Sequence, residues 1–461
     1  MRLPLRASSP VRYPTTKLPL LARLAPFLAT SLLALLVFSS FLPSPWLSSS
    51  FFSVFRQPPA PLDSLSYHSS HTPPVQGCRD PSLTALEARE TAAIVLLLRE
   101  RDLDELLPTL VNFEEQFNGV FRYPYVFISS PDEGALSPSF RRAVEGVLPP
   151  NSTVEYAVVP SAHWSIPSHL GDPEAVRRGF AEQEQRGVQY AGREGYHHMC
   201  RWYSGLWARH PTLAKYDWFW RLEPGVRFYC PITYDPIRYL ALHGKVYGFT
   251  ISVVENHNTI ATLWETVERY MRARGIDPEP RKGGVDEALW GFLTKKDEAS
   301  GKREFSGCHF WTNFEIGDLR FFRSREYQDF FNYLDDAGGF YHERWGDAPV
   351  RALGLGLFAK LDQIHHFSDI AYQHDWFLSC PRRSTSLIPS SASDLLRLQS
   401  PNPAQVLVWQ QDVVGCRCDC PKEGELQGRA EGRGVVDMGT DWRYSCLEQW
   451  EAAVRKSRGF R

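Results

Sequence analysis

Short apolar runs alternate with segments of helical periodicity through most of the chain. Residues 92–98 (AAIVLLL) form an uninterrupted apolar run of the length of a buried strand. Leucines then recur at helical spacing between Leu103 and Leu110, and residues 123–129 (YPYVFIS) form a second strand-like run. A strand, a helix and a strand in this order predict two parallel strands joined by a right-handed crossover, so the pattern indicates an α/β fold with a mostly parallel sheet.

The same alternation continues toward the C-terminus. We expect further strands at residues 155–159, 216–222 and 245–251, and helices at residues 285–293, 324–334 and 348–358. The strand at residues 216–222 is followed directly by Glu223-Pro224-Gly225, so a carboxylate stands at its carboxyl end. Ligands of open α/β sheets bind at this end of the strands, which makes Glu223 a candidate for the functional site.

The N-terminus has a different pattern, with basic residues around an uncharged apolar run at residues 24–42 and no acidic residue before Asp63. About nineteen helical residues reach close to the ~30 Å of a bilayer's hydrocarbon core. We expect a signal anchor with its basic flank in the cytosol and the bulk of the chain in the lumen; a cleaved signal peptide is the alternative. The predicted parts are a cytosolic tail (1–23), a transmembrane anchor (24–42), a Ser/Pro-rich stem (43–80), a luminal domain (81–400) and a cysteine-containing extension (401–461).

Composition and modification motifs fit this plan. The 461 residues include 43% hydrophobic residues, enough for one large α/β domain, and 51 Lys+Arg against 53 Asp+Glu. The resulting net charge of -2 argues against a nucleic-acid partner, which usually requires a basic excess. Asn151-Ser152-Thr153 is a glycosylation acceptor, which would be used in the lumen.

The nine cysteines favour an oxidising compartment. Cys416, Cys418 and Cys420 form the sequence CRCDC, and Cys446 follows. This spacing does not match a zinc-binding C-x-x-C pair, so we expect disulfides. Because nine is odd, at least one thiol lacks an intrachain partner, and Cys78 at the stem boundary is the candidate.

Polar residues that could form a site cluster late in the chain. Asp102-Leu103-Asp104 spells D-x-D, a metal-binding pattern of many nucleotide-sugar transferases, but it opens a helix, where such acids cap free N–H groups. Each remaining carboxylate or histidine could be structural when taken alone. Together they predict a site that holds a divalent cation and uses carboxylates on a neutral sugar. These clusters lie at residues 196–201, 221–223, 309–318 and 341–349, with histidines at 365, 366 and 374.

Long blocks at these same positions carry a specific resemblance. They are YHHMCRWYSGLWARHP (196–211), YDWFWRLEPGVRFYC (216–230), CHFWTNFEIGDLRFFRS (308–324) and AGGFYHERWGDAPVRALGLGLF (337–358), with shorter blocks at 92–129, 163–167 and 364–374. With them the chain resembles the fungal Golgi α-1,2-mannosyltransferases of glycosyltransferase family 15. The resemblance covers about residues 90–385, and beyond Cys380 only residues 439–447 fit.

The resemblance implies a GT-A-like nucleotide-sugar transferase fold and a type II protein of the Golgi membrane. It implies GDP-mannose as donor, Mn²⁺ as metal and transfer with retention to a mannose hydroxyl on protein-linked N- or O-glycans, as in mannoprotein biosynthesis for the cell wall. A glycolipid acceptor is the alternative that the resemblance leaves open. By motif position, Glu223 and His374 would bind the metal, with the diphosphate completing its coordination.

The resemblance also implies roles for the other site residues. Glu315 would lie beneath the anomeric carbon, as nucleophile or as stabiliser of an oxocarbenium-like state, and Asp347 would contact the acceptor hydroxyl. Tyr196 would lie near the donor, while Arg99 and Arg221 would contact the nucleotide part. Retention by double displacement and same-face attack with the leaving phosphate as base both remain open.

One position departs from the family pattern. Family members commonly have Glu-Pro-Asp where this chain has Glu223-Pro224-Gly225, which removes a possible second metal-site acid. The alternatives to an active transferase are therefore a catalytically silent carbohydrate-binding member and a retaining glycoside hydrolase. A hydrolase would need neither nucleotide nor metal, so GDP-dependent binding separates it from a transferase.

Overall fold

The computed structural model describes residues 78–79, 84, 86–277, 279, 284–381, 415–421, 435–439, 441 and 443–458. The predicted anchor at residues 24–42 and nearly all of the predicted stem lie outside these ranges. Within the described ranges, no helix is both long and apolar enough to span a bilayer.

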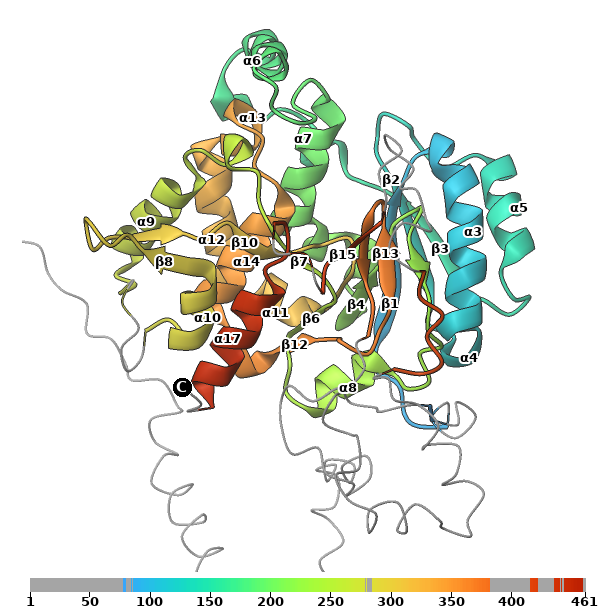
Figure 1. Ribbon diagram of the computed structural model, residues 1–461. Coiled ribbons are helices and arrows are strands. Elements are labelled where there is room, and N and C mark those ends of the chain that lie inside the picture. The colour runs from blue at the N-terminus through green and yellow to red at the C-terminus, as the bar shows by residue number, and fades with distance from the viewer. Residues whose placement is uncertain are drawn as a thin grey trace, which may run out of the picture. The chain divides into compact units, whose positions relative to one another are not determined.

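A seven-stranded sheet forms the centre of the described domain (Figure 1), with the order β12-β6-β11-β4-β1-β2-β3. Its strands are β1 (Ala92–Leu98), β2 (Tyr125–Ser129), β3 (Val154–Val158), β4 (Trp218–Arg221), β6 (Tyr247–Phe249), β11 (Glu315–Asp318) and β12 (Ile364–His366). The pairs β1–β2, β2–β3, β1–β4 and β6–β12 are parallel, as predicted. However, β11 is antiparallel to both β4 and β6, so the sheet is mixed.

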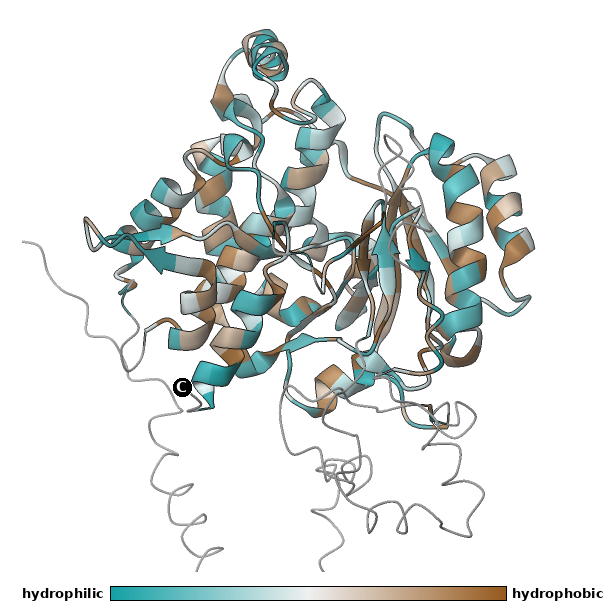
Figure 2. Ribbon diagram, viewed as in Figure 1, coloured by the Kyte–Doolittle hydropathy of each residue, from teal (hydrophilic) through white to brown (hydrophobic). Residues whose placement is uncertain are grey.

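The continuous apolar run of β1 arises because both faces of the sheet are buried. Ile94 and Leu96 belong to one hydrophobic core, with Leu106 and Phe113 of α3, whereas Ala93 and Val95 belong to a second core on the other face. Successive side chains of a strand point to opposite faces, so a strand covered on both sides is apolar at every position. Figure 2 shows the complementary pattern on α3 and α5, which carry both hydrophobic and hydrophilic positions.

Helices cover both faces of the sheet. On one side lie α3 (Leu103–Phe113) and α5 (Pro138–Val147), and on the other lie α7 (Glu194–Arg201), α12 (Arg325–Ala337) and α14 (Asp347–Phe358) (Figure 1). The predicted helices at 285–293, 324–334 and 348–358 are confirmed as α10 (Glu287–Leu293), α12 and α14. Further helices are α4 (Gly119–Phe121), α6 (Pro173–Gln185), α8 (Pro236–Leu242), α9 (Leu263–Arg274), α11 (Leu319–Arg323), α13 (Gly339–His342) and α17 (Leu447–Ser457).

A smaller sheet joins distant segments of the sequence, with the order β15-β14-β13-β5. It consists of β5 (Arg227–Phe228), β13 (Tyr372–His374), β14 (Phe377–Ser379) and β15 (Val436–Asp437). Two further strand pairs are β7 (Ser252–Val254) with β10 (Cys308–Phe310), and β8 (Thr294–Lys296) with β9 (Arg303–Phe305). Because β5 begins four residues after Glu223 and pairs with β13, the smaller sheet brings the Glu223 segment close to His374.

Four disulfides are present: Cys78–Cys416, Cys230–Cys418, Cys308–Cys446 and Cys380–Cys420. The prediction that Cys78 stays unpaired is therefore wrong, and Cys200 is the free thiol. Cys200 lies on α7 with 1% of its surface exposed and packs in the core as a small apolar side chain.

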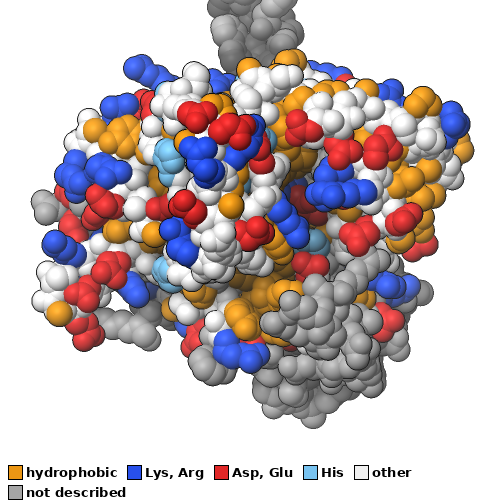
Figure 3. Space-filling model, turned by 90° about the horizontal axis from the view of Figure 1, so that it is seen from above, with side chains coloured by type: hydrophobic (Ala, Val, Ile, Leu, Met, Phe, Trp, Pro, Cys, Tyr) orange, Lys and Arg blue, Asp and Glu red, His pale blue; other side chains and the backbone are white. Residues whose placement is uncertain are grey.

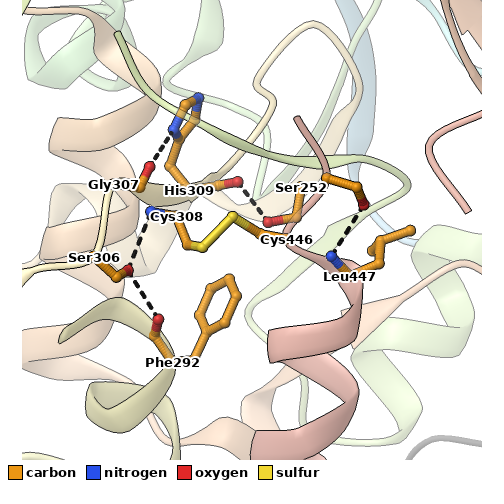
Figure 4. Close-up of a disulfide and its surroundings, with 9 residues drawn as sticks. Ser252, Phe292, Ser306, Gly307, Cys308, His309, Cys446 and Leu447 are labelled. Carbon is orange, nitrogen blue, oxygen red and sulfur yellow. Dashed lines mark hydrogen bonds between the residues drawn. A yellow bond between two sulfur atoms is a disulfide. The ribbon is translucent and has the colours of Figure 1, made fainter. Parts of the chain in front are cut away.

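The Cys308–Cys446 disulfide fastens α17 to the domain (Figure 4). Beside it, Ser252 donates a hydrogen bond to the His309 carbonyl at 2.7 Å. Trp450 of α17 packs edge-on against Phe249, with the ring centroids 5.1 Å apart. Helix α17 is thus part of the same hydrophobic core as β6 and β10.

Candidate active site

The site forms where β4 ends and β11 begins. Arg221, the last residue of β4, pairs in register with Glu315, the first residue of the antiparallel β11. Asp347 opens α14 and accepts hydrogen bonds from Arg221 Nη1 at 2.7 Å and Thr312 Oγ1 at 2.8 Å. Arg221, Glu315 and Asp347 are all buried. The antiparallel insertion of β11 therefore sets a buried arginine between two buried carboxylates.

One guanidinium contacts three carboxylates. Arg221 Nη2 lies 2.6 Å from Glu223 Oε1, and Nη1 lies 3.6 Å from Glu315 Oε1, in addition to the bond to Asp347. The Tyr203 ring lies beneath the guanidinium, 3.6 Å from its carbon to the ring centroid. Burial opposes the charge, but the surrounding carboxylates raise the pKa of Arg221 well above its ordinary value. Arg221 is thus a fixed positive charge at the centre of the site.

Glu315 is held through one of its two oxygens. Oε2 accepts a hydrogen bond from the Tyr247 hydroxyl at 3.0 Å and lies 3.0 Å from Arg351 Nε. Oε1 has no hydrogen-bond donor among the described residues. A carboxylate fixed in this way presents one oxygen for chemistry, which is the geometry that a nucleophile or a charge stabiliser requires.

Arg351 is a site residue that sequence reasoning missed. It is 1% exposed, donates from Nη2 to the Tyr203 carbonyl at 2.6 Å, and packs against the rings of Trp207 and Phe322. The spacing in the sequence could have indicated this role. Arg351 follows Asp347 by four positions, at the start of a predicted helix, and residues four apart lie on one helix face.

The two buried carboxylates differ in acidity. Burial raises the pKa of Glu315, and the charges of Arg351 and Arg221 only partly offset this. Burial also acts to raise the pKa of Asp347, but Arg221, Arg351 and the Thr312 hydrogen bond outweigh it and hold that pKa below its ordinary value. Asp347 is therefore the more acidic of the two carboxyl groups.

The predicted metal ligands lie at one edge of this cluster. His374 ends β13, and the preceding Gln373 pairs with Arg227 of β5, the strand that follows Glu223. Burial raises the pKa of Tyr372, also on β13, well above its ordinary value, and the charge of Glu223 adds to this, so Glu223 lies within electrostatic reach of β13. His374 Nδ1 lies 2.6 Å from the side-chain amide of Asn313. A ligating imidazole is commonly oriented by such a contact on its other nitrogen.

The residues at this edge fit a partly exposed Mn²⁺ site. Among the described residues, no group of three or more His, Cys, Asp or Glu side chains is placed to hold a metal ion. The two ligands that the resemblance implies are Glu223 and His374. A carboxylate and an imidazole suit Mn²⁺, and a diphosphate would supply the remaining oxygens.

Tyr196 and Arg99 lie near the cluster. Tyr196 of α7 has the Arg344 guanidinium 5.4 Å from its ring centroid; burial raises its pKa well above the ordinary value, and the charge of Asp347 adds to this. Arg99 follows β1 and is within electrostatic reach of Glu223. Its guanidinium binds Asp102 at 2.9 and 3.1 Å.

The D-x-D sequence has a structural role at Asp102, because this carboxylate binds the Arg99 side chain and accepts the Arg99 backbone N–H at 2.8 Å. It caps the short 3₁₀ turn Glu100–Asp102 and makes no capping bond to the first turn of α3.

Other polar residues highlighted by the sequence lie outside the cluster. Asp318 lies at the far end of β11, where it caps α11 and binds Arg320. His366 Nε2 contacts the Thr250 carbonyl at 3.0 Å, and the His365 ring packs against Tyr239. Asn151 is exposed in the turn before β3.

The surface above the strand ends is recessed. Figure 3 looks down on the end of the sheet from which α3 starts, and acidic, basic and histidine side chains gather around a hollow there. A separate hollow of about 880 Å³ lies between the ends of α9, α12 and α14. In that second hollow Arg274 is bound to Asp329 at 2.6 Å, and no predicted site residue lines it.

Comparison with known proteins identifies relatives. The family model described as glycolipid 2-alpha-mannosyltransferase matches residues 66–392. The chain is 39% identical over 304 residues to the glycolipid 2-alpha-mannosyltransferase of Saccharomyces cerevisiae, covering 65% of this chain and 64% of that one. It is 38% identical over 293 residues to alpha-1,2 mannosyltransferase KTR1 of the same yeast, and this match covers 64% of this chain and 70% of KTR1. For the yeast probable mannosyltransferase KTR4 the identity is 37%, and the match spans 62% of that relative's length.

Solved structures show the same fold. Core-mannan synthase A (CmsA/Ktr4) of Aspergillus fumigatus, in its Mn/GDP form, superposes with a TM-score of 0.58 at 32% identity, covering 73% of this chain and 89% of that one. Mannosyltransferase Ktr4p of S. cerevisiae, in complex with GDP, gives a TM-score of 0.60 at 31% identity, covering 73% and 88%. Sequence and fold agree, and the chain belongs to the glycolipid 2-alpha-mannosyltransferase family.

Proposed function

We propose that this chain transfers mannose from GDP-mannose to a mannose hydroxyl, forming an α-1,2 linkage with retention and depending on Mn²⁺. The observation that carries the proposal is the buried Glu315: among the described residues its Oε1 accepts no hydrogen bond and has only the 3.6 Å ion pair to Arg221, while Tyr247 and Arg351 fix Oε2. The relatives named as mannosyltransferases support the transferase over a silent sugar-binding protein or a glycoside hydrolase.

The donor would bind across the carboxyl ends of β1 and β4. Glu223 and His374 would hold Mn²⁺, which supplies charge neutralisation for the departing GDP. Core-mannan synthase A was solved with Mn and GDP, which supports this metal and nucleotide for the present chain. Arg99 and Arg221, both within electrostatic reach of Glu223, would contribute positive charge toward the diphosphate.

Glu315 and Asp347 would have different roles in the transfer reaction. Glu315 Oε1 would act on the anomeric carbon, either by covalent double displacement or by stabilising positive charge during same-face attack. Asp347, whose lowered pKa keeps it anionic, would accept a hydrogen bond from the acceptor hydroxyl. Tyr196 would border the donor sugar.

For the whole chain we propose a single-pass type II protein of the Golgi membrane, anchored by residues 24–42 and followed by the stem and a luminal catalytic domain. The basic N-terminal flank supports this orientation, and the exposed Asn151 is accessible for glycosylation. The acceptor would be a mannose of an N- or O-linked glycan.

The test is turnover of GDP-mannose with α-methyl-mannoside by the full-length chain, with and without Mn²⁺, and anomeric assignment of the product by NMR. We expect a disaccharide with an α linkage. It should form only with metal, and the Glu223→Ala variant should not form it. Glu265→Ala, an exposed carboxylate on α9, is the matched control and should retain full activity. Sugar release without GDP dependence would support a hydrolase instead.

A further inference from the structure

We propose that Thr109 and Asn112, two side chains of α3, are positioning residues that hold the segment from Glu223 to Phe228 in the geometry for metal binding. We refer to these two residues as the α3 latch. The proposal rests on the proposed function, because it gives Glu223 and His374 the metal-binding role.

Thr109 fastens the turn that follows Glu223. Its Oγ1 accepts a hydrogen bond from the Gly225 N–H at 3.0 Å, and the Val226 carbonyl lies 3.2 Å from the same oxygen. Thr109 is 3% exposed, so water does not replace these bonds readily. Oγ1 also lies 2.9 Å from the Glu105 carbonyl oxygen of the same helix, so its single proton is shared between the Glu105 and Val226 carbonyls.

Asn112 continues the contact one helical turn later. Its Oδ1 accepts the Phe228 N–H at 2.7 Å, and its Nδ2 donates to the Phe228 carbonyl at 3.1 Å. The side chain thereby binds both backbone groups of one β5 residue, much as a neighbouring strand would. Phe228 pairs on its other side with Tyr372 of β13.

These bonds leave Glu223 little freedom. On one side of it, the Leu222 N–H bonds to the Val95 carbonyl at 3.1 Å, which extends the main sheet. On the other side, Gly225 has φ +82°, a left-handed conformation that glycine adopts without strain, and its N–H is taken by Thr109. The short turn between β4 and β5 is therefore anchored at both ends.

The latch also sets the spacing between the two proposed ligands. Glu223 precedes β5, whereas His374 ends β13, and the two strands share one ladder. A shift of the Glu223 turn against α3 would move the Glu223 carboxylate relative to His374. Partners that hydrogen-bond a metal ligand directly change metal affinity by roughly 10- to 100-fold when they are lost. Because the latch acts on the backbone beside the ligand, we expect an effect at the low end of this range.

The experiment compares Mn²⁺ binding by the purified full-length chain and its variants in the presence of GDP, by titration calorimetry. Thr109→Val keeps the shape and removes the hydroxyl, and we expect the Kd for Mn²⁺ to rise about tenfold. Thr109→Ser restores the hydroxyl and should bind within about twofold of wild type. Thr109→Val should also speed hydrogen exchange of the Gly225 amide without metal.

Thr266→Val is the matched control. Thr266 is 1% exposed and, like Thr109, bonds the carbonyl four residues earlier in its helix at 2.9 Å, but it lies on α9 and makes no contact with the Glu223 segment. It should lower thermal stability about as much as Thr109→Val while leaving Mn²⁺ affinity unchanged. If Thr109→Val folds poorly, Asn112→Ala provides a second test, since it removes both hydrogen bonds to the Phe228 backbone without adding a charge.

Each outcome decides the proposal. Weakened Mn²⁺ binding in Thr109→Val alone supports the latch. Equal affinities in Thr109→Val, Thr266→Val and wild type would overturn it while leaving the proposed function intact. If wild type itself bound no Mn²⁺ with GDP, the metal site and the latch's role toward it would both be wrong, even if exchange at Gly225 rose.

Discussion

Two regions of this molecule bury carboxylates in opposite ways. In the candidate active site, the charges of Arg221 and Arg351 help to hold the pKa of buried Asp347 below its ordinary value. Asp369 lies elsewhere, near the segment that carries Cys416, and accepts a hydrogen bond from the Tyr234 hydroxyl at 2.8 Å. Burial raises the pKa of Asp369 to about 7, and the Tyr234 hydrogen bond only partly opposes this; no guanidinium of the described residues contributes.

The difference shows that burial alone does not decide whether an acid stays charged. A carboxylate moved out of water becomes neutral unless fixed positive charge compensates for the lost hydration. Glu315 is intermediate, because it has arginines beside it and yet a raised pKa. Of these three buried carboxylates, only Asp347 has a pKa below its ordinary value.

The largest expected effect comes from neutralising Glu315. Glu315→Gln keeps the size of the side chain but removes its charge and nucleophilicity, so kcat for mannosyl transfer should fall on the order of 10³-fold or more. Asp318→Asn, on the same strand but outside the cluster, is the control and should keep most of the activity. A Glu315→Gln enzyme that retained a tenth of the wild-type kcat would contradict the assigned role.

A smaller effect should follow from removing the positive charge on which Glu315 depends. Arg351→Met leaves a buried carboxylate without its Nε partner and should lower the free energy of unfolding by about 3 kcal/mol, measured by denaturant titration. Combining it with Glu315→Gln should recover part of that loss, since no charge is then stranded. Strictly additive losses would show that the two residues are not coupled.

The smallest effect should appear at Asp369 and depends on pH. Its pKa is about 7 when folded and near 3.8 when unfolded, so its contribution to stability is fully present below about pH 4 and is lost as pH rises to 7. Asp369→Asn cannot ionise, and its stability relative to wild type should therefore increase between pH 5 and 7 by at most about 1.4 kcal/mol per unit. Denaturant titrations at pH 5, 6, 7 and 8 measure this difference, and a constant difference would show that Asp369 stays charged.

Local pattern was sufficient to predict the elements that form from neighbouring residues. The strand at residues 92–98, the helix after it and the second strand follow from apolar runs and helical spacing, and β4 ends at Arg221, one residue short of the expected end, so that Glu223 still follows the strand closely. The placement of Glu223 at a strand end needed only the order of residues along one segment.

Long-range pairing was not predictable in the same way. Nothing in the sequence of β11 states that it inserts antiparallel between β4 and β6, yet this register sets Glu315 opposite Arg221. The role of Arg351 and the pairing of Cys78 with Cys416 depend likewise on segments brought together only by the fold. The family resemblance is enough to single out Glu315. Identifying Arg351 and Arg221 as the residues whose charges act on its pKa requires the contacts made in the fold.

The disulfides of the CRCDC segment have a consequence for how the protein is made. Cys416, Cys418 and Cys420 are joined to cysteines 338, 188 and 40 residues earlier in the chain. None of these bridges can close until residues 416–420 have been synthesised, so Cys78, Cys230 and Cys380 lack their native partners until then. A premature stop before residue 416 would leave all three without their partners and exposed to mispairing during biogenesis.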